Sequence, residues 1–372
     1  MKRVGITGQD GFVGWHLANT IWLIQNKFEL IPFGRNCFSD PALMDSFVQR
    51  CDVIVHLAAV NRNPDPEILY ETNVGLANAL AESLLRCGSD AHIVFSSSTQ
   101  EERDNHYGRS KQKARLILQA NAKARNACFS GLIIPNVFGP FGKPFYNSVI
   151  ATFCHQLTHG QEPRIDVDAT LKLIHVSELV KQILDVIDIN DNNPALFIPH
   201  TKEIAVSEIL TLLLQYRDEY HEKGMIPSLK DIFEVQLFNT FRCAEDIRLK
   251  FPARYTQHTD NRGAFTELIR LNIGGQVSFS TTHPGITRGN HFHTRKIERF
   301  SVIKGKAQIQ LRKIGTSEVF DFDLSGDAPA YVDMPIWYTH NITNTGDDEL
   351  LTVFWINEWF DPADPDTFFE TV

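Results

Sequence analysis

The sequence predicts two domains of different class: an α/β Rossmann-type doubly wound parallel sheet, followed by an all-β jelly-roll barrel. First, the 372 residues exceed what one hydrophobic core usually holds. Second, short apolar runs alternate with longer amphipathic segments up to about residue 250, which is typical of βαβ units. Third, glycines then separate short runs rich in Val, Ile, Phe and Thr, as in sandwiches and barrels. We place the domains at residues 1–250 and 251–372.

The elements of the first domain are expected in alternating order. The apolar runs predict strands at Val4–Thr7, Phe28–Phe33, Val53–Leu57, His92–Ser96 and Phe129–Ile134. Helical length and periodicity predict helices at Val13–Gln25, Glu67–Cys87, Tyr107–Ala120 and Ser207–Glu222. We expect the connection to the second domain within Phe238–Tyr255.

Composition excludes several classes of protein. A net charge of −9 argues against a nucleic acid as partner, because such binding depends on clustered Lys and Arg. The six cysteines form no C-x-x-C pair, which favours reduced thiols. The apolar run before Gly8 is too short for a signal peptide, and no stretch approaches the roughly 20 apolar residues of a membrane helix. We therefore expect a cytoplasmic protein without a membrane partner.

Three glycines follow the first strand at G-x-x-G-x-x-G spacing. In a strand-to-helix turn such glycines permit a tight bend, the approach of a pyrophosphate and close helix packing. The helix N-terminus adds free N–H groups that bind phosphate. The residues expected to bind a dinucleotide are Gly8, Gln9, Asp10, Gly11, Phe12, Val13 and Gly14.

Arg35 stands at the end of the second predicted strand, where NAD-specific domains usually carry an acidic residue. A cation there accommodates a ribose 2′-phosphate, so Arg35 favours NADPH as cofactor. The alternative is an arginine that simply faces solvent.

A serine run, Ser96–Ser98, ends the fourth predicted strand and is followed by Tyr107 and Lys111. On a helix the last two share a face, so we expect the Lys111 ammonium to lower the pKa of the phenol and to hold the nicotinamide ribose. Tyr107 then protonates a carbonyl oxygen while hydride reaches the carbon. A serine hydroxyl stabilises the same oxygen.

These motifs resemble the extended short-chain dehydrogenase/reductases, which act largely on nucleotide sugars. Further similar strings are Asp52–Ala59, Asn73, Pro135–Pro140 and Leu173–Glu178. The resemblance implies Ser98 as catalytic serine, with Ser97 as the alternative. It also implies cofactor contacts from Leu57, Ala58, Ala59, Asn73, Tyr107 and Lys111. Asn73 and His175 have a second interpretation, in which they only satisfy backbone groups.

Three histidines and one carboxylate in the second domain predict a metal site. His291 and His293 on one strand would face the same side, Glu298 would follow on a neighbouring strand, and His340 comes later. This ligand set suits Zn²⁺, Mn²⁺, Fe²⁺ or Ni²⁺ alike, and Zn²⁺ is our expectation. The alternative is a set of surface or core histidines without metal.

The spacing of these residues resembles both motifs of the cupins. Trp337 replaces the usual glycine of the second motif, and the gap from Gly326 to Pro335 is longer than the pattern. The strings Asp260–Glu267 and Gly285–His291 also resemble deoxysugar 3,5-epimerases, whose general base aligns with His291. Since His291 is a candidate ligand here, the base stays open among Tyr338, Lys296 and a ligand histidine.

Over its whole length the chain resembles the CapF and WbjC family of capsule and lipopolysaccharide synthesis. The resemblance implies that a UDP-linked 4-keto-6-deoxy-N-acetylhexosamine is epimerised at C3 in the cupin. It then implies reduction at C4 by NADPH in the first domain, giving UDP-2-acetamido-2,6-dideoxy-β-L-talose on the way to UDP-N-acetyl-L-fucosamine. A C4 ketone acidifies the hydrogen at C3, which explains this order.

Three other functions remain open from sequence. The cupin could serve only as a dimerisation or binding module beside an active reductase. The chain could sense redox state through a bound dinucleotide, or the cupin could be an oxygenase. The metal could be catalytic or structural, since four protein ligands fill a tetrahedral shell. Cupin barrels have edge strands that need covering, so we expect a homodimer.

Overall fold

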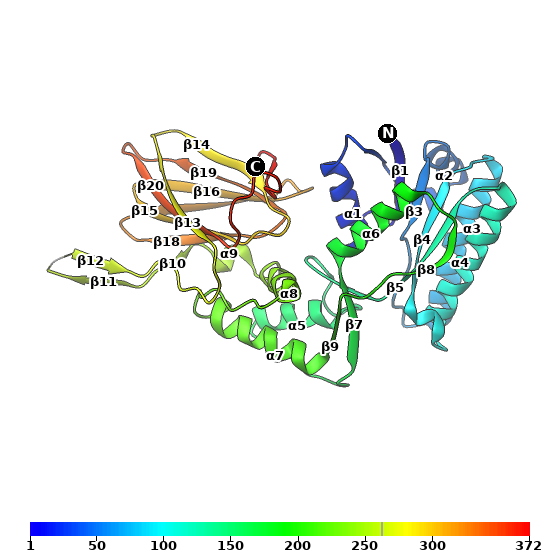
Figure 1. The fold of residues 1–372 in the computed structure, drawn as a ribbon, viewed down its shortest axis with the longest axis horizontal. Coiled ribbons are helices and arrows are strands. Elements are labelled where there is room, and N and C mark those ends of the chain that lie inside the picture. Colours follow the sequence, from blue (N-terminus) through cyan, green and yellow to red (C-terminus); the bar gives the residue numbers. More distant parts are fainter. Residues whose placement is uncertain (262) are drawn as a thin grey trace. The chain divides into compact units, whose positions relative to one another are not determined.

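The computed structural model describes residues 1–261 and 263–372, and it divides into two compact units. The first unit comprises residues 1–152 and 166–206, and the second comprises residues 153–165 and 207–372. Figure 1 labels their elements. These units interleave along the sequence, whereas the predicted domains, 1–250 and 251–372, are continuous stretches and stay a prediction.

A six-stranded parallel sheet forms the centre of the first unit, as predicted. Its strands, in spatial order, are β2 (Phe28–Ile31), β1 (Lys2–Thr7), β3 (Val53–His56), β4 (His92–Ser98), β5 (Phe129–Ile134) and β8 (Asn193–Phe197). Each neighbouring pair is parallel. The strand order reverses between β1 and β3, and ligands of such sheets bind at the carboxyl ends of the strands beside this point.

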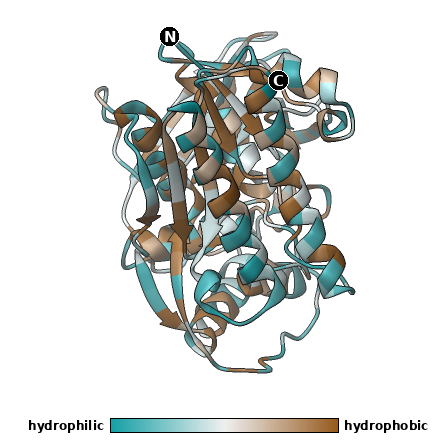
Figure 2. Cartoon of the chain, turned by 90° about the vertical axis from the view of Figure 1, so that its right-hand side faces the viewer, coloured by the Kyte–Doolittle hydropathy of each residue, from teal (hydrophilic) through white to brown (hydrophobic). Residues whose placement is uncertain are grey.

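Helices cover both faces of this sheet. They are α1 (Phe12–Leu23), α2 (Pro41–Val48), α3 (Pro66–Arg86), α4 (His106–Arg125) and α6 (Val176–Ile189). One apolar cluster joins α1 and α6 to the sheet, and a second joins α2, α3 and α4. Figure 2 shows hydrophobic and hydrophilic bands mixed along the helices, as expected of elements that bury one side. The doubly wound class is thus confirmed.

Smaller elements extend the first unit. A three-stranded sheet consists of β6 (Asn136–Phe138), β7 (Thr170–His175) and β9 (Lys202–Ala205). It contains the strings Pro135–Pro140 and Leu173–Glu178, and the second of these leads into α6. Two short 3₁₀ turns, Arg35–Phe38 and Thr99–Glu102, follow β2 and β4.

Two five-stranded antiparallel sheets face each other in the second unit. The first has the order β10 (Ala253–Arg254), β18 (Ala330–Met334), β15 (Glu298–Lys304), β20 (Leu350–Ile356) and β13 (Gln276–Thr282). The second has the order β17 (Val319–Ser325), β16 (Lys306–Lys313), β19 (Tyr338–Asn344), β14 (Thr287–Phe292) and β21 (Phe368–Phe369). Val302, Ile309 and Val332 are fully buried in the core of this barrel. The all-β prediction is confirmed.

A hairpin and four helices complete the second unit. In Figure 1 the hairpin β11 (Gln257–Asp260) and β12 (Gly263–Thr266) extends away from the two sheets. Its string Asp260–Glu267 includes Arg262, which lies outside the described residues. The helices are α5 (Val149–Thr158), whose first four residues belong to the first unit, α7 (Val206–Tyr216), α8 (Ile232–Arg242) and α9 (Ile247–Lys250).

The expected connection Phe238–Tyr255 is therefore not a loop. It contains the end of α8, all of α9 and β10, and Phe238 and Phe241 are fully buried. Arg242 donates from Nη2 to the carbonyl oxygen of Met334 at 2.9 Å. Phe238 and Phe241 of α8 pack against Tyr216 of α7, and Ile247 of α9 belongs to the apolar core of the barrel.

Candidate functional sites

The glycine turn lies between β1 and α1 at the reversal point of the parallel sheet. A Cβ atom on Gly14 would come within 2.1 Å of the Gly8 carbonyl oxygen, so only glycine allows α1 to approach this closely. Gly11 precedes the helix and has no side chain to cap it. The first N–H groups of α1 are therefore open to an anionic group such as a pyrophosphate.

The residues after β3 lie directly beside this turn. Leu57 donates its N–H to the Thr7 carbonyl oxygen at 3.1 Å, and Ala58 N lies 3.4 Å from Thr7 Oγ1. Thr7 also contacts Nδ1 of the buried His56 at 2.7 Å. Burial lowers the pKa of His56 to about 3, so the ring is neutral. The structure thus brings Leu57–Ala59 and the glycine turn to one edge, as the sequence predicts.

Arg35 begins the 3₁₀ turn that follows β2. Its Nε atom lies 3.4 Å from Asp10 Oδ2 in the glycine turn, and its side chain is 85% exposed. The guanidinium is therefore next to the predicted dinucleotide site while most of its surface remains in solvent. This position is compatible both with a 2′-phosphate contact and with a solvent-facing arginine.

Asn73 occupies a buried position on α3. Its Oδ1 atom accepts from Val60 N at 2.7 Å, and its Nδ2 atom donates to Val60 O and to Ser110 Oγ, both at 3.0 Å. These bonds fasten the segment after β3 to α4. The geometry favours the interpretation in which Asn73 satisfies backbone groups, and a cofactor contact stays a prediction.

Close packing between α4 and the end of β4 positions Tyr107. A Cβ atom on Gly108 would lie 2.0 Å from the Gln100 carbonyl oxygen, so glycine is required where α4 meets the Thr99–Glu102 turn. Asn105 caps the helix by accepting from Gly108 N at 2.7 Å. Tyr107 is consequently held in the first turn of α4, next to the serines that end β4.

The two candidate serines have different surroundings. Ser97 is 4% exposed and donates its hydroxyl to Glu101, whose carboxylate also pairs with Arg115 at 2.7 Å. Ser98 is half-buried, and its Oγ atom accepts from Gln100 N at 3.2 Å. Because Ser98 Oγ is the acceptor in this bond, its hydroxyl proton is still available for a hydrogen bond to a substrate. The geometry favours Ser98 as the serine that contacts a substrate oxygen.

Burial is the largest cause of the pKa shifts of Tyr107 and Lys111. It raises the pKa of Tyr107 to about 12, with a further contribution from Tyr146. It lowers the pKa of Lys111 to about 8, and the Lys111 ammonium lies 4.6 Å from the centre of the Phe95 ring. The expected lowering of the phenol pKa by Lys111 is wrong, because apolar surroundings disfavour the phenolate. Tyr107 stays protonated at neutral pH, as a proton donor must.

The four predicted metal ligands come together in the barrel. His291 lies on β14, His293 just follows it, Glu298 begins β15 and His340 lies on β19. One ligand atom from each lies within 4.8 Å of the others. Glu298 Oε2 is 3.2 Å from His293 Nε2 and 3.3 Å from His340 Nε2.

The cluster has the chemistry of a divalent metal site. Burial alone would raise the pKa of Glu298, but His293 and His340 hold it far below its ordinary value, so the carboxylate is ionised. Burial and the neighbouring imidazoles lower the pKa of His291 to about 4, so this ring is neutral. His340 Nε2 is buried without a well-directed hydrogen-bond partner. Burial alone would lower the pKa of His293, but Glu298 and Asp366 outweigh it and raise that pKa, so a divalent ion would displace a proton from this ring on binding. Neutral imidazoles and an ionised carboxylate are the forms that bind Zn²⁺ and similar ions.

Trp337 and the base candidates Lys296 and Tyr338 lie near the predicted ligands along the sequence. Trp337 has a φ of +65°, so it keeps the left-handed backbone of the glycine that it replaces. Lys296 is 2% exposed and donates from Nζ to the Pro365 carbonyl oxygen at 2.7 Å, which makes it part of the scaffold. Burial raises the pKa of Tyr338 above its ordinary value. Tyr338 and a ligand histidine remain as candidate bases.

One further residue at this site, Asp366, belongs to no motif in the sequence. Its carbonyl oxygen lies 2.5 Å from Nδ1 of the ligand His293, which is 73 residues earlier in the chain. The contact depends on β21 pairing with β14. A two-residue strand without a motif offers no signal from which such a contact could be predicted.

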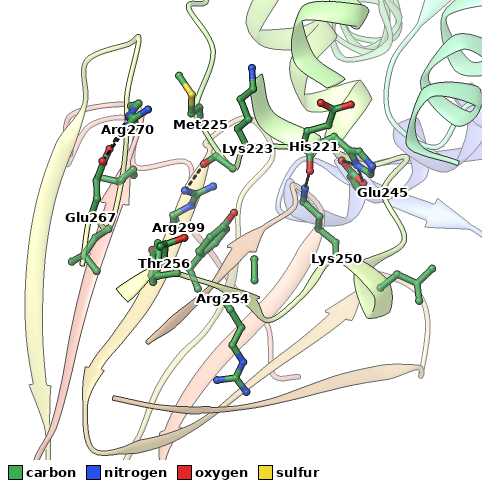
Figure 3. Close-up of a pocket in the computed structure, with 18 of the residues that line it drawn as sticks. His221, Lys223, Met225, Glu245, Lys250, Arg254, Thr256, Glu267, Arg270 and Arg299 are labelled. Atoms are coloured by element: carbon green, nitrogen blue, oxygen red, sulfur yellow. Dashed lines mark hydrogen bonds and ion pairs between the residues drawn. The ribbon is translucent and has the colours of Figure 1, made fainter. Parts of the chain in front are cut away.

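A separate cavity of about 1070 Å³ opens in the second unit (Figure 3). Its lining includes residues from the end of the π-helical turn after α7, from α9 and from the base of the hairpin, and none of the four metal ligands. Many of its charges are paired: Arg270 with Glu267 and His221 with Glu245, each at 2.8 Å. Arg299 pairs with Asp333 at 2.6 Å. These pairs account for much of the polar lining.

Comparison with known proteins gives matches along the whole chain. Residues 4–197 match the NAD dependent epimerase/dehydratase family, and residues 258–368 match the polysaccharide biosynthesis C-terminal domain. The chain is 33% identical over 371 residues to UDP-2-acetamido-2,6-beta-L-arabino-hexul-4-ose reductase of Pseudomonas aeruginosa, with 98% of each chain covered.

Solved structures agree with these matches. This chain is 32% identical to the capsular polysaccharide assembling protein CapF from Staphylococcus aureus, whose crystal structure is known. The match covers 100% of both chains, with a TM-score of 0.63. RMD from Pseudomonas aeruginosa complexed with NADPH is 20% identical over 59% of this chain and 83% of its own, with a TM-score of 0.54. That second likeness concerns the fold alone. Across the described residues, no helix has the length and apolar character needed to cross a membrane.

Proposed function

Because the chain belongs to the CapF family of nucleotide-sugar enzymes of capsule synthesis, we propose that it catalyses two successive reactions on one UDP-sugar. The cupin epimerises C3 of a UDP-4-keto-6-deoxy-N-acetylhexosamine, and the first domain then reduces C4 with NADPH. The product is UDP-2-acetamido-2,6-dideoxy-β-L-talose, a precursor of UDP-N-acetyl-L-fucosamine. The observation that carries the proposal is that one chain holds a Ser-Tyr-Lys set in one unit and a four-ligand cluster in the other.

Three residues at the sheet edge are suited to the reduction. Tyr107 gives its phenol proton to the C4 oxygen, and a pKa of about 12 keeps that proton in place at neutral pH. Ser98 donates a hydrogen bond to the same oxygen. Lys111 holds the nicotinamide ribose of the bound dinucleotide, which supplies the hydride. Arg35, beside the glycine turn, favours NADPH over NADH.

The barrel is suited to proton exchange at C3. A C4 ketone makes the C3 hydrogen acidic, and its removal from one face and return to the other inverts that carbon. A divalent ion held by His291, His293, Glu298 and His340, with Zn²⁺ as the proposed ion, would stabilise negative charge on the ketone oxygen. His291 is the half-buried member of the cluster. His291 and Tyr338 are the candidates for the base that removes the C3 proton.

The inhibitor in one solved relative belongs to a class of compounds that chelate metals. A CapF structure that is 30% identical to this chain, with both chains covered in full and a TM-score of 0.60, contains the inhibitor 3-isopropenyl-tropolone. Tropolones carry two adjacent oxygens and chelate divalent ions. The rival role for the metal is structural, with all four positions taken by protein.

The alternative function is a 4-ketoreductase whose cupin serves for dimerisation or binding. The Pseudomonas relative is named for reduction of an arabino-hexul-4-ose, which is the second step alone. The two functions differ in whether C3 of the substrate exchanges its proton on this chain.

Incubation with the UDP-4-keto-6-deoxy-N-acetylhexosamine in D₂O tests the proposal. We expect deuterium at C3 by NMR before NADPH is added, and NADPH oxidation afterwards. Tyr107→Phe should keep the exchange and lose the oxidation, whereas His340→Ala should lose the exchange. Oxidation of NADPH without any exchange at C3 would leave the monofunctional reductase. If both signals were absent, this substrate would be excluded.

We also propose that the protein is a cytoplasmic homodimer. β13 is the last strand of its sheet, and its outer face exposes 59% of Val277 and 71% of Phe279. Exposed apolar edge strands need covering, and a second copy of the barrel would provide that cover. Light scattering should give a dimer for the native protein and a monomer for Phe279→Asp. The six free cysteines fit a reducing compartment.

A further inference from the structure

The segment from Pro365 to Val372 runs alongside the strand that carries the first metal ligand. In the register of β21 and β14, Phe369 pairs with His291 and Phe368 with Phe292. Glu370 extends this pairing by donating its N–H to the Asn290 carbonyl oxygen at 3.0 Å. The segment is thus part of the ligand sheet.

Asp366 is the residue through which this segment meets the loop between two ligands. Its Oδ1 atom accepts from Thr294 N at 3.1 Å and from Thr294 Oγ1 at 2.6 Å. Its Oδ2 atom accepts from Arg295 N at 3.0 Å and from Lys296 N at 3.1 Å. The residue is 3% exposed, so these four bonds are shielded from water. They fix the loop that joins His293 to Glu298.

The backbone of Asp366 acts directly on a ligand. Its carbonyl oxygen, 2.5 Å from His293 Nδ1, can only accept, so the proton of a neutral ring must lie on Nδ1. The other nitrogen, Nε2, faces Glu298 Oε2 at 3.2 Å and is the one available to bind an ion. Hydrogen bonds of this kind orient metal-binding histidines and set which nitrogen binds.

The conformation of Asp366 indicates that these contacts hold it in place. Its φ is +40°, in the left-handed region that a residue other than glycine seldom adopts. The four carboxylate bonds and the His293 contact converge on this one residue. They offset the cost of its backbone conformation, because the buried carboxylate accepts hydrogen bonds from three N–H groups and one hydroxyl.

We propose that Asp366 is a positioning residue of the metal centre, and that the segment 365–372 sets the affinity of the site through it. The carboxylate fixes the loop 294–296, and the carbonyl oxygen fixes the ring of His293. This inference depends on the metal centre proposed above, and it deepens that proposal by naming a residue that does not itself bind the ion.

The test compares Asp366→Ala with a matched control in the same segment. Asp364→Ala removes a carboxylate that pairs with Arg295 at 2.9 Å but is 68% exposed and contacts no ligand. Affinity for Zn²⁺ is measured on the full chain by competition with a coloured chelator. We expect Asp366→Ala to bind Zn²⁺ about 10–100-fold more weakly and Asp364→Ala to bind as the native protein does.

A second readout needs no metal. Hydrogen exchange in the metal-free protein should be faster at the Thr294, Arg295 and Lys296 amides in Asp366→Ala, and unchanged in Asp364→Ala. Asp366→Gly separates backbone strain from the carboxylate, because glycine tolerates the positive φ. It should weaken Zn²⁺ binding as Asp366→Ala does, while its thermal midpoint should exceed that of Asp366→Ala.

The outcomes distinguish this inference from the metal centre itself. Native affinity and native amide exchange in Asp366→Ala would overturn the positioning role and leave the metal centre standing. Native protein that takes up no Zn²⁺ would overturn the metal centre and this role together. If Asp366→Ala does not fold by circular dichroism, Asp366→Asn takes its place, and native affinity in that variant would equally overturn the inference.

Discussion

Trp337 donates its backbone N–H to the carbonyl oxygen of His293 at 2.8 Å, which links the segment before β19 to a predicted metal ligand. The same tryptophan has a positive φ, is 6% exposed and stacks on Phe292 with ring centres 5.7 Å apart. The residue therefore combines a strained backbone with a buried side chain, and the two have opposite effects on stability.

Replacing Trp337 measures that balance. Trp337→Gly removes roughly 1–2 kcal/mol of backbone strain but loses about 3–5 kcal/mol of buried packing. We expect the barrel to lose about 2 kcal/mol of stability in urea unfolding followed through a signal from the second unit. Equal or greater stability in the variant would show that the strain outweighs the packing.

The buried Lys111 predicts a pH dependence of cofactor use. In the free enzyme its pKa is about 8, so the ammonium that holds the ribose is lost as the pH rises through that value. The ratio kcat/KM for NADPH reports groups of the free enzyme and should fall above about pH 8. A profile that stays flat to pH 10 would contradict this. The pKa of Tyr107 is about 12, so its ionisation should contribute little over this range.

The same shift has a consequence for stability. A lysine whose pKa is lowered in the folded state destabilises that state wherever it is charged, which here means below about pH 8. The penalty disappears as the pH rises from about 8 to the ordinary value of 10.5. Lys111→Met should thus raise stability at pH 7 by about 1–3 kcal/mol, measured by thermal unfolding without cofactor, while reductase activity is lost. A less stable variant at pH 7 would count against this reasoning.

Arg35 tests the cofactor preference. Arg35→Ala should reduce the preference for NADPH over NADH, as a ratio of kcat/KM values, by about 10–100-fold, since hydrogen bonds to charged groups contribute about 1.5–3 kcal/mol. The side chain is 85% exposed, so the fold should be unaffected. Arg109→Ala, another exposed cation of the same unit, serves as control. An unchanged ratio would mean that Arg35 simply faces solvent.

The ion pair of Glu101 and Arg115 stabilises the Thr99–Glu102 turn, which follows the serines at the end of β4. Their side chains are 7% and 13% exposed, so Arg115→Met leaves a nearly buried carboxylate without its cation. We expect a loss of about 3–5 kcal/mol, measured by denaturant unfolding of the first unit. The exposed pair of Arg3 and Asp52 is the control, and Arg3→Met should cost less than about 1 kcal/mol. If Arg115→Met and Arg3→Met lost similar amounts of stability, burial of the ion pair could not explain the cost.

Removal of the metal should separate the two activities. A chelator is expected to abolish deuterium exchange at C3 and to leave NADPH binding, followed by cofactor fluorescence, at its native level. The four ligands all belong to the second unit, whereas the glycine turn belongs to the first. Exchange that persists in fully metal-free protein would favour a structural ion.

Local pattern was enough to predict the strands and the metal cluster. The five predicted strands of the parallel sheet lie within two residues of β1 to β5, because buried parallel strands are continuous apolar runs. His291, His293, Glu298 and His340 were predictable because their motif spacing places them on neighbouring strands. Helix α2 was missed since it has only eight residues, although Asp40 and Pro41 mark its start.

What could not be predicted depends on contacts between distant residues. Asp366 reaches His293 through strand pairing that no local pattern shows. The raised pKa of Tyr107 comes from burial, which a sequence does not report. The predicted connection Phe238–Tyr255 overlaps the end of α8, since an apolar stretch can equally be a helix that covers another surface.

The helices before the barrel limit where the barrel can be separated from the rest of the chain. Tyr220 donates its hydroxyl to the Asp333 carboxylate at 2.9 Å, and Arg242 donates to the carbonyl of Met334 in the same strand, β18. A recombination that transferred only residues 251–372 to another protein would leave both acceptors without these donors inside the new host. A cassette that keeps both donors therefore includes α8 and the turn after α7, and the complete second unit comprises residues 153–165 as well as 207–372.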